Sequence, residues 1–132
     1  MNIEMSYLLL AFATVLAPMA QGQSSPPQPK ITGVLTIVSP KPGVTPEQVM
    51  KIMPAEIRAT VPLYLEGKIQ QWYTRGDGRG VIFLLNCQDV AEARALIESL
   101  PLSKENLVDE QFIPVGPLLQ LGILLRDNPT NK

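Results

Sequence analysis

The sequence contains no histidine and a single cysteine, Cys87, among its 132 residues. The absence of histidine excludes a Ser-His or Cys-His nucleophile pair, imidazole acid–base catalysis near neutral pH and His-ligated metal sites. A lone cysteine forms neither an internal disulfide nor a thiolate metal cluster. We therefore expect no metal and no organic cofactor, and we expect Cys87, which follows an apolar run, to be buried.

Charged residues are also sparse, at 17% of the sequence, and eleven basic residues nearly balance twelve acidic ones. The sequence has no basic stripe with interleaved aromatic residues, so it does not favour nucleic-acid binding. A hydrophobic fraction of 45% is typical of a globular protein. The length is enough for one domain and not for two.

Residues 1–22 are predicted to be a signal peptide. The apolar run at 7–20 is too short for a bilayer span of about 20 residues but has the length of a signal-peptide core. Ala20 and Gly22 are small residues at the −3 and −1 positions of a cleavage site. The segment before the run carries Glu4 and no basic residue, so an uncleaved anchor and an accidental apolar leader stay as alternatives. We expect an exported protein, periplasmic or secreted, with membrane attachment only where the leader is not cleaved.

The rest of the chain is predicted to form a proline-rich linker at 23–30, one domain at 31–125 and a polar tail at 126–132. The domain alternates β-branched apolar runs with amphipathic segments, in the order β-α-β-β-α-β. The predicted strands are 31–39, 68–75, 81–87 and 107–115, and the predicted helices are 46–66 and 88–100, the second ending before Pro101. Thr45 is expected to cap the first helix, and Asp89 the second. The inward stripe of the first helix is expected to be Val49, Ile52, Met53, Ile57 and Val61.

This order predicts a ferredoxin-like α+β fold with a four-stranded antiparallel sheet of order 4-1-3-2. The first and third strands are the most apolar and are therefore expected at the centre, with the first buried on both faces. Pro54 and Pro62 predict a kink in the first helix or two consecutive helical pieces. With both helices on one face, the other face must be polar, bind a partner or pair with another sheet, and pairing with a second copy of the chain is expected. The apolar segment 117–125 is expected to dock on a neighbouring subunit.

Several local patterns occur together in the second half of the domain. A helix ends in ALIESLPL at 95–102, an acidic strand follows at 108–110, and proline follows twice within 113–117. Earlier, Glu and Gly at 66–67 end the first helix, before a strand that carries Trp72. In these features the sequence resembles the muconolactone isomerase-like family of the dimeric α+β barrel superfamily.

Over residues 31–121, this resemblance implies a βαββαβ subunit, sheet-to-sheet dimers and, in some members, higher rings. It implies isomerisation or rearrangement of small lactones and related rings without a metal or an organic cofactor. It also implies an acid–base side chain in a pocket between the helices and the sheet, and Glu56 stands where the family has a glutamate.

Cofactor-free isomerisation requires a carboxylate with a raised pKa in an apolar site and a donor to the developing enolate. Glu56 is the candidate catalytic residue, and the alternative is a solvated residue on the helix surface. Tyr64, Trp72, Tyr73 and Arg75 are candidate substrate-binding residues, although the aromatic three are equally consistent with the core and a dimer interface. The glycine-rich segment 76–80 predicts a β-hairpin rather than a phosphate loop.

Two functions of different classes follow. The first is a cofactor-independent isomerase or cyclase that acts on a small lactone or other cyclic oxygenated compound, which predicts a closed pocket holding Glu56 and an aromatic residue. The second is a non-catalytic exported module that forms dimers or rings, with or without a small apolar ligand, which predicts an exposed Glu56 and an inter-sheet space filled by side chains. Asp109 and Glu110 on the last strand are expected to face solvent or to protect the sheet edge.

Overall fold

The computed structural model describes residues 28–122, so the predicted signal peptide at 1–22 and the polar tail at 126–132 lie outside the described residues. The elements follow the predicted order, with one additional short helix before the last strand. They are β1 (Gly33–Pro40), α1 (Pro46–Leu65), β2 (Ile69–Thr74), β3 (Val81–Leu85), α2 (Val90–Glu98), α3 (Pro101–Lys104) and β4 (Val108–Val115). Among the described helices, none combines the length and the apolar character that a membrane crossing requires.

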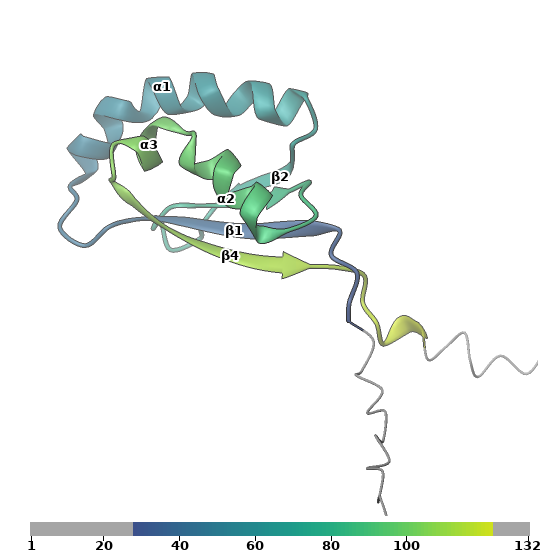
Figure 1. Cartoon of the computed structure of the whole chain (residues 1–132). Coiled ribbons are helices and arrows are strands. Elements are labelled where there is room, and N and C mark those ends of the chain that lie inside the picture. Colours follow the sequence, from purple (N-terminus) through teal and green to yellow (C-terminus); the bar gives the residue numbers. More distant parts are fainter. Residues whose placement is uncertain (1–27, 123–132) are drawn as a thin grey trace, which may run out of the picture.

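The strands form one four-stranded sheet in the order β2-β3-β1-β4, and each neighbouring pair is antiparallel. The two most apolar strands therefore occupy the centre, as the sequence predicted. The helices lie together on one face of this sheet, and Figure 1 shows α1, α2 and α3 above β1 and β4. The result is a two-layer α+β fold, whose topology is compatible with a ferredoxin-like domain.

Helix α1 is a single helix of 20 residues that runs through both internal prolines (Figure 1), so the prediction of two consecutive pieces is wrong. Residues near each proline pack against the core, Met53 beside Pro54 and Leu63 beside Pro62, and this packing holds the helix together. Its start carries the predicted capping box at Thr45, whose hydroxyl accepts from the backbone of the third helical residue.

The inward stripe of α1 differs from the prediction in its second half. The residues that pack against the core are Val49, Ile52, Met53, Ala59 and Leu63. Ile57 and Val61 are 53% and 37% exposed, so they do not belong to the core. At positions 56 and 60, which also point inward, the helix carries two polar residues, Glu56 and Thr60. These two side chains form part of the site described below.

Strand β1 is buried on one face only, and the prediction of burial on both faces is wrong. Val34, Thr36 and Val38 are buried beneath the helices, whereas the alternating residues Leu35 and Ile37 are partly exposed. No described part of the chain covers that second face. We call it the open face, and its apolar side chains come from all four strands: Leu35, Ile37, Tyr73, Ile82, Leu84 and Ile113.

The connections between the elements agree with most of the predicted turns, helix caps and helix ends. Residues 76–80 form the hairpin between β2 and β3, closed by the Arg75 N–H that donates to the Gly80 carbonyl. Asp89 caps α2 through its carboxylate, and Cys87 is buried. The second helix ends before Pro101, as predicted, and Pro101 also begins α3, where its fixed φ and missing N–H suit the first helical position.

The start of the apolar C-terminal segment is exposed as far as it is described. Leu118, Leu119 and Leu121 are each more than half exposed. Two turn hydrogen bonds, from the N–H groups of Leu121 and Gly122, close this segment on itself. The remaining residues of the predicted docking segment, beyond 122, lie outside the described part.

Candidate functional site

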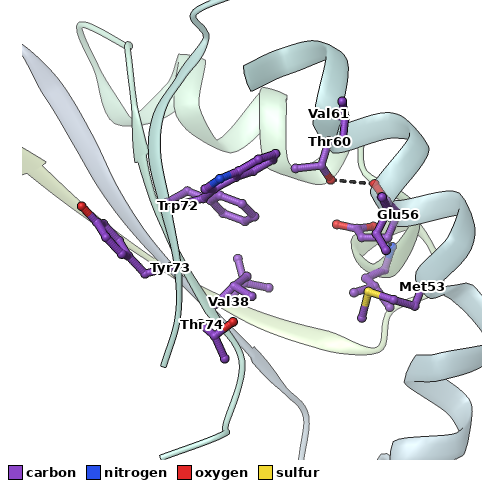
Figure 2. A pocket seen from close by; sticks show the side chains of 12 residues that line it. Val38, Met53, Glu56, Thr60, Val61, Trp72, Tyr73 and Thr74 are labelled. Carbon is purple, nitrogen blue, oxygen red and sulfur yellow. Dashed lines mark hydrogen bonds between the residues drawn. The ribbon is translucent and has the colours of Figure 1, made fainter. Parts of the chain in front are cut away.

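A cavity of about 330 Å³ lies between α1 and the helix-facing side of the sheet. The walls are predominantly apolar, and the side chains of α1 face those of β1, β2 and β3 across it (Figure 2). The partly exposed Ile57, Val61 and Trp72 mark the side that opens to solvent. The lining residues are Val38, Met53, Glu56, Ile57, Thr60, Val61, Trp72, Tyr73, Thr74, Val81, Phe83 and Leu102.

Glu56 is the one carboxylate that lines this cavity. Its position in the inward stripe of α1 leaves it half-buried, so the alternative of a solvated surface residue does not describe it. Atom Oε2 accepts a hydrogen bond of 2.8 Å from the backbone N–H of Leu102 in α3. Burial raises the pKa of the Glu56 carboxyl above its ordinary value, and the Leu102 N–H opposes that rise.

The second oxygen of Glu56 is available to a ligand. Among the described residues, the Leu102 N–H is the one hydrogen-bond donor to the carboxylate, and it binds Oε2. Figure 2 shows the carboxylate directed across the cavity toward the strand that carries Trp72. A group with Oε1 free and a raised pKa can accept a proton from a bound molecule and return it.

Two threonines and the indole supply the other polar atoms of the wall beside Glu56. The Thr60 hydroxyl donates to the Glu56 backbone carbonyl at 2.6 Å, within α1, and keeps its lone pairs for a ligand. Thr74 and Trp72 project from β2, across the cavity from α1 (Figure 2). A hydroxyl or an indole N–H on the wall opposite a base can donate to an oxygen on which negative charge develops.

Trp72 forms a flat aromatic wall together with Tyr64. The two rings are stacked, with centroids 4.4 Å apart and planes 7° from parallel. Tyr64 comes from the end of α1 and covers the indole without lining the cavity itself. The pair therefore fixes the orientation of the indole from outside the cavity.

The side chains of the other two predicted site residues do not point toward Glu56. Tyr73 is among the residues that border the cavity, but Figure 2 shows its ring projecting away from it, on the opposite side of β2 from Trp72. Arg75 lies on the open face, where it donates to Ser39 at 2.9 Å and pairs with Asp77 at 2.5 Å. Strand alternation explains both placements, because residues 73 and 75 point opposite to 72 and 74.

The two acidic residues of β4 lie outside the cavity. Asp109 is exposed, as predicted. Glu110, on the edge strand β4, is only partly exposed and accepts a hydrogen bond from the Ser103 hydroxyl of α3. Among residues 28–122, no group of three or more Cys, Asp or Glu side chains is placed to hold a metal ion.

Sequence reasoning missed Thr60, Thr74 and Leu102 as parts of the site. Thr60 follows Glu56 by four residues, so the helical period could have identified it. Thr74 follows Trp72 by two residues and shares its face of β2. Leu102 contributes a backbone N–H from a helix that the pattern did not predict, and it carries no side-chain signal.

The chain matches no protein-family model, and no curated protein is significantly similar to it in sequence.

Proposed function

We propose that the protein is a cofactor-independent isomerase or cyclase that acts on a small lactone or other cyclic oxygenated compound by proton transfer through Glu56. The observation that carries the proposal is a single half-buried carboxylate, with a raised pKa, on the wall of an otherwise apolar cavity. Apolar clefts with a few convergent polar groups and a perturbed titratable residue are typical of small-molecule sites. The α+β topology is compatible with the ferredoxin-like subunit that the resemblance to the muconolactone isomerase-like family implies.

In this proposal, Glu56 Oε1 takes a proton from a carbon next to the carbonyl of the bound ring. The electron pair of the broken C–H bond moves toward the carbonyl oxygen, where the Thr74 hydroxyl or the Trp72 indole N–H stabilises the enolate. Glu56 then returns the proton to a different carbon of the conjugated system. The net change is an isomerisation, so atoms and electrons balance without a further reactant.

Turnover of a panel of unsaturated lactones, followed by ultraviolet absorbance, tests this function. Glu56→Gln should abolish turnover, because the amide keeps the acceptor for the Leu102 N–H and loses the base. Glu105→Gln is the matched control, since Glu105 is exposed and does not line the cavity. Turnover that survives in the Glu56 variant, or no turnover across the panel, would contradict the proposal.

Self-association is proposed as part of the same function, and it is the main feature of the alternative, a non-catalytic exported dimeric or ring-forming module. Its support is the open face, because an uncovered sheet face with apolar side chains from every strand is unusual in a monomer. Light scattering of the purified protein should give at least a dimer. Ile82→Lys, at the centre of that face, should give a monomer with an unchanged cavity, and a monomeric wild-type protein would contradict this part.

A further inference from the structure

The charges around the cavity restrict the substrate beyond the function proposed above, on which this inference rests. Glu56 is the one charged side chain that lines the cavity, and no lysine or arginine lines it. Its charge therefore has no cationic partner there.

The basic residues of the described chain are placed elsewhere. Arg58 follows Glu56 closely in sequence but is exposed and does not line the cavity. Arg75 is bound to Ser39 and Asp77 on the open face, and Arg94 lies over the Phe112 ring. A ligand that brought an anionic group into the cavity would meet the Glu56 carboxylate and an apolar wall, with no side chain to neutralise it.

The remaining walls favour a flat ring. Phe83 is buried and lies on the sheet side of the cavity, and Trp72 presents its indole beside it. Because Tyr64 stacks on one face of the indole, a bound ring meets the face or the edge that remains. Aromatic walls of this kind hold planar, conjugated molecules in offset-stacked or edge-to-face contact.

We propose that the substrate is an uncharged, planar, conjugated ring compound, such as a lactone, enone or phenol without a carboxylate or phosphate group. Its ring lies against Trp72 and Phe83, and its acidic C–H or hydroxyl faces Glu56 Oε1. A cavity of about 330 Å³ is near the lower limit of about 300–1,000 Å³ for small-molecule sites, which fits a compound of one or two rings.

The fluorescence of Trp72 tests this inference directly. Trp72 is the sole tryptophan of the 132 residues, so its emission reports on the cavity without other indoles. The probes are three butenolides that share one ring and carry a side chain ending in a methyl ester, a carboxylate or an amine. At pH 7 we expect saturable binding of the ester, and binding of the carboxylate about tenfold weaker or more, because two like charges a few ångströms apart near a protein surface repel strongly.

Glu56→Gln should reduce the difference between ester and carboxylate to about threefold or less, since the repelling charge is gone. Glu105→Gln should preserve the full difference. Both variants keep the Leu102 N–H acceptor, so a change in discrimination does not reflect a loss of fold.

The outcomes separate this inference from the proposed function. Carboxylate binding that equals or exceeds ester binding would overturn the inference, as would amine binding that exceeds both or an absence of saturable ester binding at millimolar concentration. Ester binding without turnover would leave the inference in place and remove the isomerase. Turnover confined to the free acid would support the isomerase and overturn the inference of an uncharged substrate.

Discussion

Replacing Glu56 by alanine removes the acceptor of the Leu102 N–H, and the structure allows the effect on stability to be worked out. Helix α3 has no cap from its own N-cap residue, because that residue is Leu100. The Glu56 carboxylate of α1 takes the place of a cap by accepting from the Leu102 N–H. Leu102 is 8% exposed, so its N–H has little access to water once the carboxylate is gone. Loss of a helix cap costs about 0.5–2 kcal/mol, and a buried unsatisfied donor about 1–3 kcal/mol. We expect Glu56→Ala to lower the free energy of unfolding by about 1–2 kcal/mol.

Glu56→Gln separates the cap from the charge. The amide oxygen accepts the same hydrogen bond, and no charge is buried, so we expect a change of less than about 0.5 kcal/mol at pH 7 or a small gain. Urea unfolding of the two variants and of Glu105→Ala, followed by circular dichroism, measures these differences. For a domain of this size, 1 kcal/mol corresponds to about 4–8 °C in Tm. A glutamine variant as unstable as the alanine variant would refute the reasoning.

The difference in stability between the wild type and Glu56→Gln should depend on pH in a defined direction. Burial raises the pKa of Glu56 in the folded state above its ordinary value of 4.5. The folded protein therefore binds this proton at pH values where the unfolded chain has released it, and the charged carboxylate lowers stability at neutral pH. The stability of the wild type relative to Glu56→Gln should rise as the pH falls from 7 toward 4.5 and stay constant below. A relative stability that falls over this window would contradict the assigned direction.

Three further predictions concern other parts of the chain. Gly80→Ala should destabilise the fold by about 2 kcal/mol or more in urea unfolding, because Gly80 has φ +116° and an added Cβ would lie 2.0 Å from the Val38 carbonyl oxygen. Gly78 has φ +71° but open space around it, so Gly78→Ala should cost only about 1–2 kcal/mol. Thr36→Val should stabilise the fold by about 1 kcal/mol, because the fully buried Thr36 hydroxyl lacks a hydrogen-bond partner in the described part of the chain; a loss of stability would show that the hydroxyl is bonded in solution. Mass spectrometry of protein recovered after expression with export should give a chain cleaved after Gly22, and a full-length mass would contradict the predicted signal peptide.

The sheet could be predicted from sequence because hydrophobicity and topology give the same answer. The continuous apolar runs around Val34 and Phe83 belong in the middle of the sheet, and the weakly alternating strand with Trp72 belongs at its edge. Gly67 marks the end of the first helix, and the glycine-rich segment 76–80 marks a tight hairpin. Together they fix where the helix ends and which two strands are joined by the hairpin.

The site could be predicted only in part, because its assembly depends on a contact between distant segments. Glu56 was identified, but its burial follows from α3, a four-residue helix that has too short a pattern to be recognised. Ile57 and Val61 were assigned to the core because they continue an apolar stripe, and only the tertiary structure shows which edge of that stripe faces inward. Arg75 was assigned to the site without regard to strand alternation, which places it on the other face.

The choice of glutamate at position 56 is itself informative about function. A cap for α3 needs only an acceptor, which the N-cap position does not supply because Leu100 is buried in the core. Glutamine at 56 would provide it from the same place without burying a charge. The sequence instead places an ionisable group, with one oxygen fixed by Leu102 and the other free, against an apolar cavity. Relative to glutamine, such a group lowers stability at neutral pH, and residues of this kind are typical of sites where function, rather than folding, determines the side chain.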